Sequence, residues 1–141
     1  MAYTKKLPWE YLEEFRGKDF SGEWPTFPEM LKISTKRFGD RPYFTVFDGP
    51  NESKHTLTYS QVLTNVENIA KWMIENGIKK GDKIAVMGKN SPEWGTTFLA
   101  IFFASGIAIP IDNGLHEPEV VNIVNTAKPV LVFCDDDKAA F

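Results

Sequence analysis

The chain has 141 residues, of which 43% are hydrophobic and 25% are charged, and its formal net charge is −3. This length and composition are typical of one globular domain and exclude a disordered or collagen-like chain. Acidic and basic residues are interspersed, so the sequence offers no basic stripe for a phosphate backbone, and we expect no nucleic-acid partner.

The first 25 residues form an extension before the first strong helix. Pro8 suits a first helical turn and Gly17 is placed to stop a helix, so a short helix over Pro8–Arg16 is expected. The aromatic residues here could form a docking or lipid-facing surface, but we prefer packing against the domain. They are Trp9, Tyr11, Phe15, Phe20 and Trp24.

Two capping boxes mark helix starts. Thr26 with Glu29 forms one and Thr58 with Gln61 the other, because a hydroxyl and a carboxyl or amide three residues later satisfy each other's backbone N–H groups. Apolar residues at helical spacing follow each box, and glycines end both helices. The buried faces are expected at Phe27, Met30, Leu31, Ser34 and Phe38 before Gly39, and at Val62, Val66, Ile69 and Met73 before Gly77.

Strands and helices alternate through the rest of the chain. Pro42–Phe47 and Lys54–Leu57, joined by a polar loop opening at Asp48–Gly49, are predicted to form an antiparallel pair. The later strands are continuous apolar runs, which favours a parallel sheet covered by helices and joined by right-handed crossovers. The predicted class is therefore α/β, a mostly parallel sheet with helices on both faces plus an antiparallel hairpin. The later elements are Lys83–Met87, Pro92–Ala104, Ile107–Ile111, Pro118–Ala127 and Val130–Cys134.

Two of these elements have surfaces that other parts of the protein should cover. The Pro92–Ala104 helix carries one charge, Glu93, and is apolar in most directions, so it should be covered nearly all round. The Val130–Cys134 strand would leave its outer edge free. We therefore expect the natural sheet to continue past residue 141, and we expect this chain alone to self-associate through an uncovered edge or apolar surface.

Three polar segments are candidates for a binding site. Gly88–Ser91 lies between a strand and a helix but lacks the glycine pattern of a nucleotide loop, so a plain turn is preferred over anion binding. Asp135–Asp137 could suggest a cation site, but a solvated helix start is preferred. Asp112 and Asn113 follow a strand end, where ligands of α/β sheets bind, yet turn chemistry is the preferred interpretation.

The remaining candidates are single side chains. His55 and His116 have no second ligand at metal-binding spacing, so both should be structural or exposed. Cys134 follows an apolar strand with no nearby histidine, so a buried inert thiol is expected, and a single cysteine excludes internal disulfides. The longest apolar run, Phe98–Ile111, is too short to span a bilayer, and no signal segment is visible, so a cytoplasmic location is expected.

Four segments recur in one order and spacing: Leu57–Val62, Gly81–Val86, Asn90–Trp94 and Phe103–Asp112. In series they resemble adenylate-forming enzymes, the superfamily of acyl-CoA synthetases, luciferases and peptide-synthetase adenylation domains. Leu57–Val62 is similar to the family element L-T-Y-x-E-L, with Gln61 where Glu is frequent. Phe103–Asp112 is similar to A-x-x-x-G-x-x-x-V-P-[IL], with Ser105 before its glycine. Gly81–Val86 and Asn90–Trp94 lie between these two segments, in the order that the family has. The amino-acid sequence of the segments most resembles that of long-chain fatty acyl-CoA ligases.

The resemblance implies a division of the chain and a function for its parent. Residues 1–25 would be an N-terminal extension and residues 26–141 an incomplete N-terminal α/β subdomain of an AMP-binding domain. The parent would join a fatty acid to ATP, release pyrophosphate, and transfer the acyl group to CoA, with Mg²⁺. The partners implied are the remainder of the parent chain and its fatty acid substrate.

The family's phosphate loop, adenine contacts and catalytic lysine come later in the parent. The resemblance therefore implies that this fragment holds no catalytic, cofactor-binding or metal-binding residue, binds none of ATP, Mg²⁺ or CoA, and is inactive alone. The full-length parent would be cytoplasmic, with peripheral membrane association left open. Alternatives are a free-standing α/β binding module, a fragment of another adenylate-forming enzyme and, least favoured, a dinucleotide-binding oxidoreductase domain.

Overall fold

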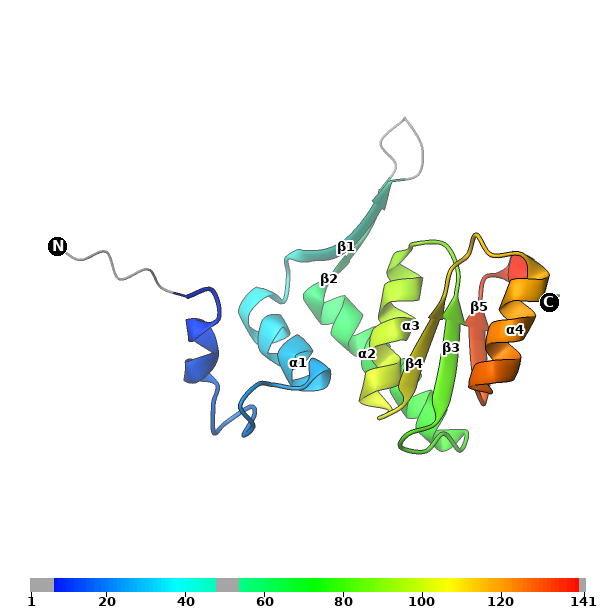
Figure 1. Cartoon of the computed structure of the whole chain (residues 1–141). Coiled ribbons are helices and arrows are strands. Elements are labelled where there is room, and N and C mark those ends of the chain that lie inside the picture. Colours follow the sequence, from blue (N-terminus) through cyan, green and yellow to red (C-terminus); the bar gives the residue numbers. More distant parts are fainter. Residues whose placement is uncertain (1–6, 48–53, 140–141) are drawn as a thin grey trace.

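The computed structural model describes residues 7–47 and 54–139 (Figure 1), so the predicted loop at Asp48–Gly49 lies outside the described residues. In chain order, a hairpin and two helices come before a three-stranded sheet. One later helix lies on the opposite face of this sheet from the other helices. The elements are η1 (Glu10–Glu14), α1 (Phe27–Phe38), β1 (Pro42–Phe47), β2 (Lys54–Thr58), α2 (Tyr59–Glu75), β3 (Lys83–Met87), α3 (Pro92–Phe103), β4 (Ile107–Ile111), α4 (Glu117–Ala127), β5 (Leu131–Cys134) and η2 (Asp136–Lys138).

The predicted helix at Pro8–Arg16 is a short 3₁₀ helix. Its N-cap residue, Trp9, provides no side-chain cap, so only five residues close into helical turns. The aromatic residues around it divide into two groups. Tyr11, Phe15 and Phe20 pack with Leu12, Met30 and Ile33 in a small core, as predicted. Trp9 and Trp24 are each about half exposed and pack edge to face at 6.4 Å.

Both predicted capping boxes are present. The Glu29 carboxylate accepts from the Thr26 backbone N–H at 2.8 Å, and the Gln61 side-chain oxygen accepts from the Thr58 N–H at 2.9 Å. The reciprocal bonds to the threonine hydroxyls measure 3.4 and 3.3 Å. These bonds satisfy N–H groups that helix starts otherwise leave unpaired, so α1 and α2 begin where the pattern predicts.

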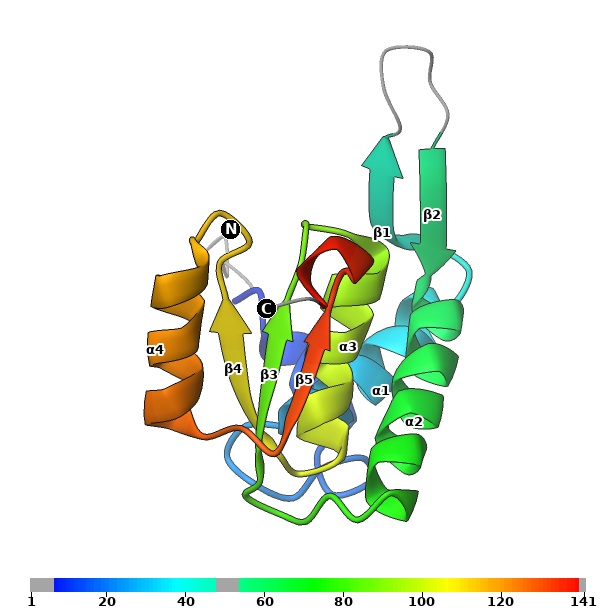
Figure 2. The same cartoon turned by 90° about the vertical axis from the view of Figure 1, so that its right-hand side faces the viewer.

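The sheet has the order β4-β3-β5, and both strand pairs are parallel. Ala85 lies between Ile109 and Val132 in register. In Figure 2 the chain passes behind the sheet through α3 to reach β4, then in front through α4 to reach β5. These are the right-handed crossovers that the apolar runs predicted, and they place helices on both faces. β1 and β2 pair antiparallel, as predicted.

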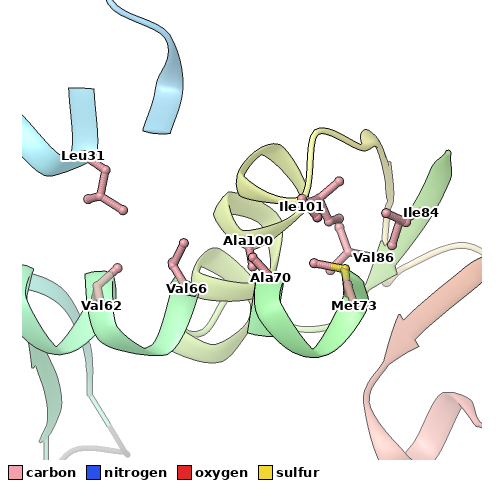
Figure 3. Close-up of a cluster of buried hydrophobic side chains, with 10 residues drawn as sticks. Leu31, Val62, Val66, Ala70, Met73, Ile84, Val86, Ala100 and Ile101 are labelled. Atoms are coloured by element: carbon pink, nitrogen blue, oxygen red, sulfur yellow. The ribbon is translucent and has the colours of Figure 1, made fainter. Parts of the chain in front are cut away.

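The main core lies between the sheet and the layer of α2 and α3 (Figure 3). Apolar residues at helical spacing on α2 face the corresponding residues of α3 and β3, so each element buries one side against the others. A smaller core lies under α4, around Ala85, Met87, Ile111 and Val120. The labelled residues of the main core are Leu31, Val62, Val66, Ala70, Met73, Ile84, Val86, Ala100 and Ile101.

The α3 helix is covered on several sides, as its apolar sequence requires. It contacts α1, α2 and β1 as well as β3 and β4. Phe102 stacks on Phe27 of α1 at 4.8 Å, and the Phe44 ring of β1 packs over Gly95. A Cβ atom at Gly95 would lie 2.6 Å from that ring, so this position needs glycine for the hairpin to approach.

The turn after α3 contains two small residues with different roles. Ser105, with φ of 58°, takes the left-handed conformation that ends the helix. Gly106 instead allows close packing, because a Cβ there would lie 2.7 Å from Cδ1 of Ile84. None of the helices in residues 7–47 and 54–139 is long and apolar enough to cross a membrane.

Candidate functional site

A cleft of about 550 Å³ opens at the carboxyl ends of β3 and β4. This end of a parallel α/β sheet is where such folds bind ligands. The turn after β3 supplies one wall and the turn after β4 supplies the other. The cleft therefore unites two of the three predicted segments. Its lining residues are Gly88, Lys89, Asn90, Trp94, Pro110, Ile111, Asp112 and Asn113.

The start of α3 borders this cleft. The Ser91 hydroxyl accepts a 3.1 Å hydrogen bond from the Trp94 backbone N–H, and Pro92 occupies the first helical turn. One N–H of the first turn is thus satisfied internally and proline removes another, which leaves the helix start less able to hold an anion. The Trp94 ring stacks on Phe98 at 5.3 Å, and Trp94 is one of the residues that line the cleft.

Asp135 connects the cleft to the third segment. Its carboxylate accepts a 2.8 Å hydrogen bond from the Lys89 backbone N–H. It also lies against Gly88, where a Cβ atom would sit 2.7 Å from Oδ1. Asp136 and Asp137 belong instead to the exposed turn η2, so the three aspartates do not converge and the predicted solvated helix start is a single 3₁₀ turn.

Asp112 and Asn113 have different roles in the second wall. The Asp112 carboxylate accepts from the Gly114 N–H at 2.7 Å, which is the turn chemistry that the sequence predicted. The Asn113 side-chain oxygen is buried and has no hydrogen-bond partner within the described part of the chain. A buried acceptor of this kind costs free energy until a donor reaches it, so Asn113 marks the place where a water or ligand donor would be stabilised.

The charges of the cleft do not suit a nucleotide triphosphate. Among its lining residues, Lys89 is the one cationic residue and Asp112 the one acidic residue. The backbone N–H of Lys89 already donates to the Asp135 carboxylate, so it is not available to a phosphate. Within residues 7–47 and 54–139, no three His, Cys, Asp or Glu side chains are grouped to hold a metal ion. The residues present do not fit ATP with Mg²⁺, and we derive no chemical step from them.

The single-residue candidates lie apart from the cleft. His55 is exposed on β2 with Nε2 3.4 Å from Oε1 of Glu93, and His116 is exposed at the start of α4. Cys134 is exposed, so the predicted buried thiol is wrong. It ends an edge strand, and its side chain faces a groove of about 450 Å³ beside α4 that no further helix fills in the described chain.

Sequence reasoning missed two residues that shape this end of the sheet. Asp135 was grouped with its acidic neighbours, but its partner is 46 residues away and no local pattern indicates it. Glu119 accepts from the His116 N–H at 3.0 Å. Its spacing of three residues from the N-cap position is the signal that could have been used, although histidine replaces the expected hydroxyl.

Comparison with known proteins identifies the family of this fold. The profile of the AMP-binding enzyme family matches residues 31–140, from the first core residue of α1 to beyond η2. The match includes both walls of the cleft and the strands β1 to β5. It contains all four resembling segments, which lie between Leu57 and Asp112, and it also includes Asp135.

The relatives are named as different kinds of enzyme. L-proline–[L-prolyl-carrier protein] ligase of Streptomyces coelicolor is 32% identical over 120 residues, covering 85% of this chain and 21% of its own. Long-chain-fatty-acid–CoA ligase 5 of Rattus norvegicus is 27% identical over 93 residues, covering 64% and 14%. The hybrid PKS-NRPS synthetase pvhA of Talaromyces variabilis is 30% identical over 122 residues, covering 85% and 3%. The chain thus spans about a fifth or less of these relatives.

Solved structures share the fold. The fatty acid AMP ligase of Legionella pneumophila superposes with a TM-score of 0.73 at 24% identity, covering 82% of this chain and 20% of that one. The N-terminal subdomain of Klebsiella oxytoca NpsA superposes with a TM-score of 0.69 at 22% identity, covering 79% and 28%. The fold is that of the N-terminal subdomain of adenylate-forming enzymes. The family profile matches most of the length of this chain, so the chain belongs to the AMP-binding enzyme family.

Proposed function

We propose that this chain is the N-terminal scaffold of an ATP-dependent ligase that adenylates a fatty acid and transfers the acyl group to CoA. The observation that carries the proposal is the family match over residues 31–140, which covers the sheet and its cleft. The ligase class follows from the family. The assignment of fatty acid and CoA as the substrates rests on the amino-acid sequence of the resembling segments and on relatives such as the rat ligase.

Carrier-protein ligases are the principal competitor. The Streptomyces relative, whose name gives L-proline and a carrier protein as substrates, covers more of this chain than the rat ligase. In this proposal the resembling segments are parts of the scaffold, so they support the acyl-CoA assignment through likeness of sequence alone. A substrate comparison is therefore the test that separates the two.

In this proposal residues 1–25 are an extension and residues 26–141 are one part of a larger AMP-binding domain. We propose that none of these residues is catalytic or binds ATP, Mg²⁺ or CoA. The cleft lining supports this, because Lys89 is its one cationic residue and Asp112 its one acidic residue. Stabilising a transferred phosphoryl group needs several donors or cations aimed at it. The remainder of the parent chain supplies them, and the ligase works in the cytoplasm.

The first experiment is an assay of the 141-residue chain for palmitate-dependent exchange of pyrophosphate into ATP with Mg²⁺. We expect no exchange above the rate with heat-denatured protein. Exchange that depends on palmitate would contradict the scaffold proposal. The product of the source gene read past codon 141 is the positive comparison, and it should exchange pyrophosphate with palmitate and then form palmitoyl-CoA.

Two outcomes would redirect the assignment. Exchange with an amino acid but not with palmitate, followed by loading of a carrier protein, would replace fatty acid and CoA with carrier-protein chemistry. A stop codon directly after codon 141 would remove the ligase altogether and favour a free-standing binding module. Either result leaves the family membership unchanged, since it rests on residues 31–140.

A further inference from the structure

The chain contains two asparagines that are followed directly by glycine, Asn76–Gly77 and Asn113–Gly114. An asparagine in this position can lose its side-chain amide without an enzyme, because glycine has no side chain to hinder attack by its backbone nitrogen. The attacked atom is Cγ of the asparagine. The nitrogen must come close to it, so the folded structure decides which of the two pairs reacts.

The Asn76–Gly77 pair is held away from this geometry at the end of α2. Asn76 has φ of −93° and ψ of 18°, and a ψ this small turns the Gly77 nitrogen toward the Asn76 backbone nitrogen and away from Cβ. The Asn76 Nδ2 also donates to the Trp72 carbonyl at 2.9 Å, and the Gly77 N–H donates to the Ile74 carbonyl at 3.1 Å. This end of α2 must unwind before the pair can react.

The Asn113–Gly114 pair lies at the centre of the turn that joins β4 to α4 (Figure 2). The Leu115 N–H donates to the Asp112 carbonyl at 3.3 Å and closes this turn of four residues. The Asn113 side chain makes no hydrogen bond in the part of the chain that the structure describes, although its Oδ1 atom is buried. Rotating this side chain therefore breaks no hydrogen bond, and it allows Oδ1 to gain one from water.

Asp112 supplies a proton acceptor at the attacking nitrogen. Its carboxylate accepts the 2.7 Å hydrogen bond from the Gly114 N–H. A carboxylate in this position can take the proton as the new bond to Cγ forms, in the manner of a general base. At Gly77 the acceptor is instead the backbone carbonyl of Ile74, which is far less basic than a carboxylate.

We propose that Asn113 is a self-modification site, at which Gly114 and Asp112 deamidate the Asn113 side chain in the folded chain. The Gly114 nitrogen bonds to Cγ, and its proton passes through the Asp112 carboxylate to the Asn113 side-chain nitrogen. The bond between Cγ and that nitrogen breaks and ammonia leaves. Water then opens the resulting succinimide ring at either carbonyl carbon, which gives aspartate or isoaspartate. The site is independent of any ligase reaction.

The modification would change the cleft that Asn113 lines. A neutral amide becomes a carboxylate beside Asp112, while Lys89 remains the one cationic residue among those lining the cleft. Isoaspartate also adds one carbon atom to the backbone between β4 and α4. The cleft would therefore become more negative as the protein ages, and it would repel anions more strongly.

The test is incubation of the folded 141-residue chain at neutral pH, followed by proteolytic digestion and mass spectrometry of the peptides that contain each pair. Chromatography separates the aspartate and isoaspartate forms, and fragmentation assigns the position. Asn113 should convert at least about tenfold faster than Asn76, because Asn76 must first lose its hydrogen bonds at the end of α2. In urea the two should convert at similar rates, since glycine follows both.

Asp112→Asn separates the two roles of Asp112. The amide oxygen of the new side chain can still accept the hydrogen bond from the Gly114 N–H, but it cannot act as the base. Conversion of Asn113 should fall at least about tenfold in the folded chain and change little in urea. Asp137→Asn removes the same charge from the exposed turn η2, so it is the matched control and should convert Asn113 as the wild type does.

Three results would overturn the proposal. Equal conversion of Asn76 and Asn113 in the folded chain would show that the turn gives Asn113 no advantage. An unconverted Asn113 in the folded chain, over a time in which the chain in urea converts, would show that the fold protects it. Unchanged conversion in the Asp112→Asn chain would remove Asp112 from the reaction.

Discussion

The carboxylate of Asp135, at the end of β5, accepts a 2.8 Å hydrogen bond from the backbone N–H of Lys89, in the turn after β3. The two residues are 46 positions apart in sequence. The bond joins neighbouring strands at the end of the sheet where the cleft lies, and it depends on the absence of a side chain at Gly88. Replacing Asp135 with Ala should therefore lower the free energy of unfolding by about 1–3 kcal/mol, measured by urea denaturation.

Gly88 provides a matched test of the same bond. Gly88→Ala should destabilise the chain by about 1–2 kcal/mol, because its Cβ displaces the Asp135 carboxylate and breaks the bond to Lys89. In an Asp135→Ala background the same change should cost almost nothing. Equal costs in both backgrounds would show that Gly88 acts through something other than Asp135. Asp137→Ala, in the exposed turn, should stay within about 0.5 kcal/mol of wild type.

The effect of Gly95→Ala on stability should depend on Phe44. The substitution should destabilise the wild-type chain and stabilise the Phe44→Ala chain. In the wild-type chain the new Cβ meets the Phe44 ring at 2.6 Å, so we expect a loss of about 1–3 kcal/mol and weaker packing of β1 on α3. With Phe44→Ala the clash disappears, and the higher helix propensity of Ala should stabilise α3 by up to about 1 kcal/mol. Thermal unfolding of the four variants measures this cycle. A loss in both backgrounds would contradict the assigned contact.

The two capping boxes should respond differently to pH. Hydrogen bonds from Thr26 hold the pKa of the Glu29 carboxyl below its ordinary value of 4.5, so this acid is more ionised in the folded chain. Its contribution is therefore present above pH 4.5 and is lost as pH falls through the folded-state pKa. The cost of Thr26→Ala in unfolding free energy should accordingly shrink below pH 4.5.

Thr58→Ala is the control, because Gln61 does not ionise. Its cost, about 1 kcal/mol for loss of an N-cap hydroxyl, should stay constant between pH 3 and 7. Urea denaturation at several pH values gives both series. A parallel decline in the two variants would show a general effect of acid on the chain, rather than titration of Glu29.

Cys134 should react with a thiol reagent under native conditions. Its side chain is exposed at the end of an edge strand, so one equivalent of 5,5′-dithiobis(2-nitrobenzoate) should label the folded chain without denaturant. Labelling that occurs only in urea would show that the Cys134 thiol is covered in the folded chain and would contradict this prediction. Cys134→Ala gives the blank.

Local patterns were enough to predict most elements of this fold. β3 and β4 have the predicted bounds, because each is an apolar run between a charged residue and a turn. The start of α1 follows from its capping box. The Pro8–Arg16 segment lacked a cap, and its helix is correspondingly short. Patterns within a few residues thus suffice where hydrogen bonds are local.

The site was harder to predict because it depends on contacts between distant segments. Nothing near Asp135 in the sequence indicates Lys89, and nothing near Gly95 indicates Phe44. The buried state expected for Cys134 was wrong for a related reason. Period and hydropathy indicate that a strand is apolar, but they do not indicate which of its neighbours are present to cover it.

The position of α3 also determines how the chain unfolds. This helix contacts α1, the hairpin strand β1 and the strands β3 and β4. Releasing it would expose the stacked pair Phe27 and Phe102 and the main core together. The chain should consequently lose its structure in a single cooperative step, and the amides of α3 should exchange with solvent through global unfolding, whereas those of η1 exchange through local fraying.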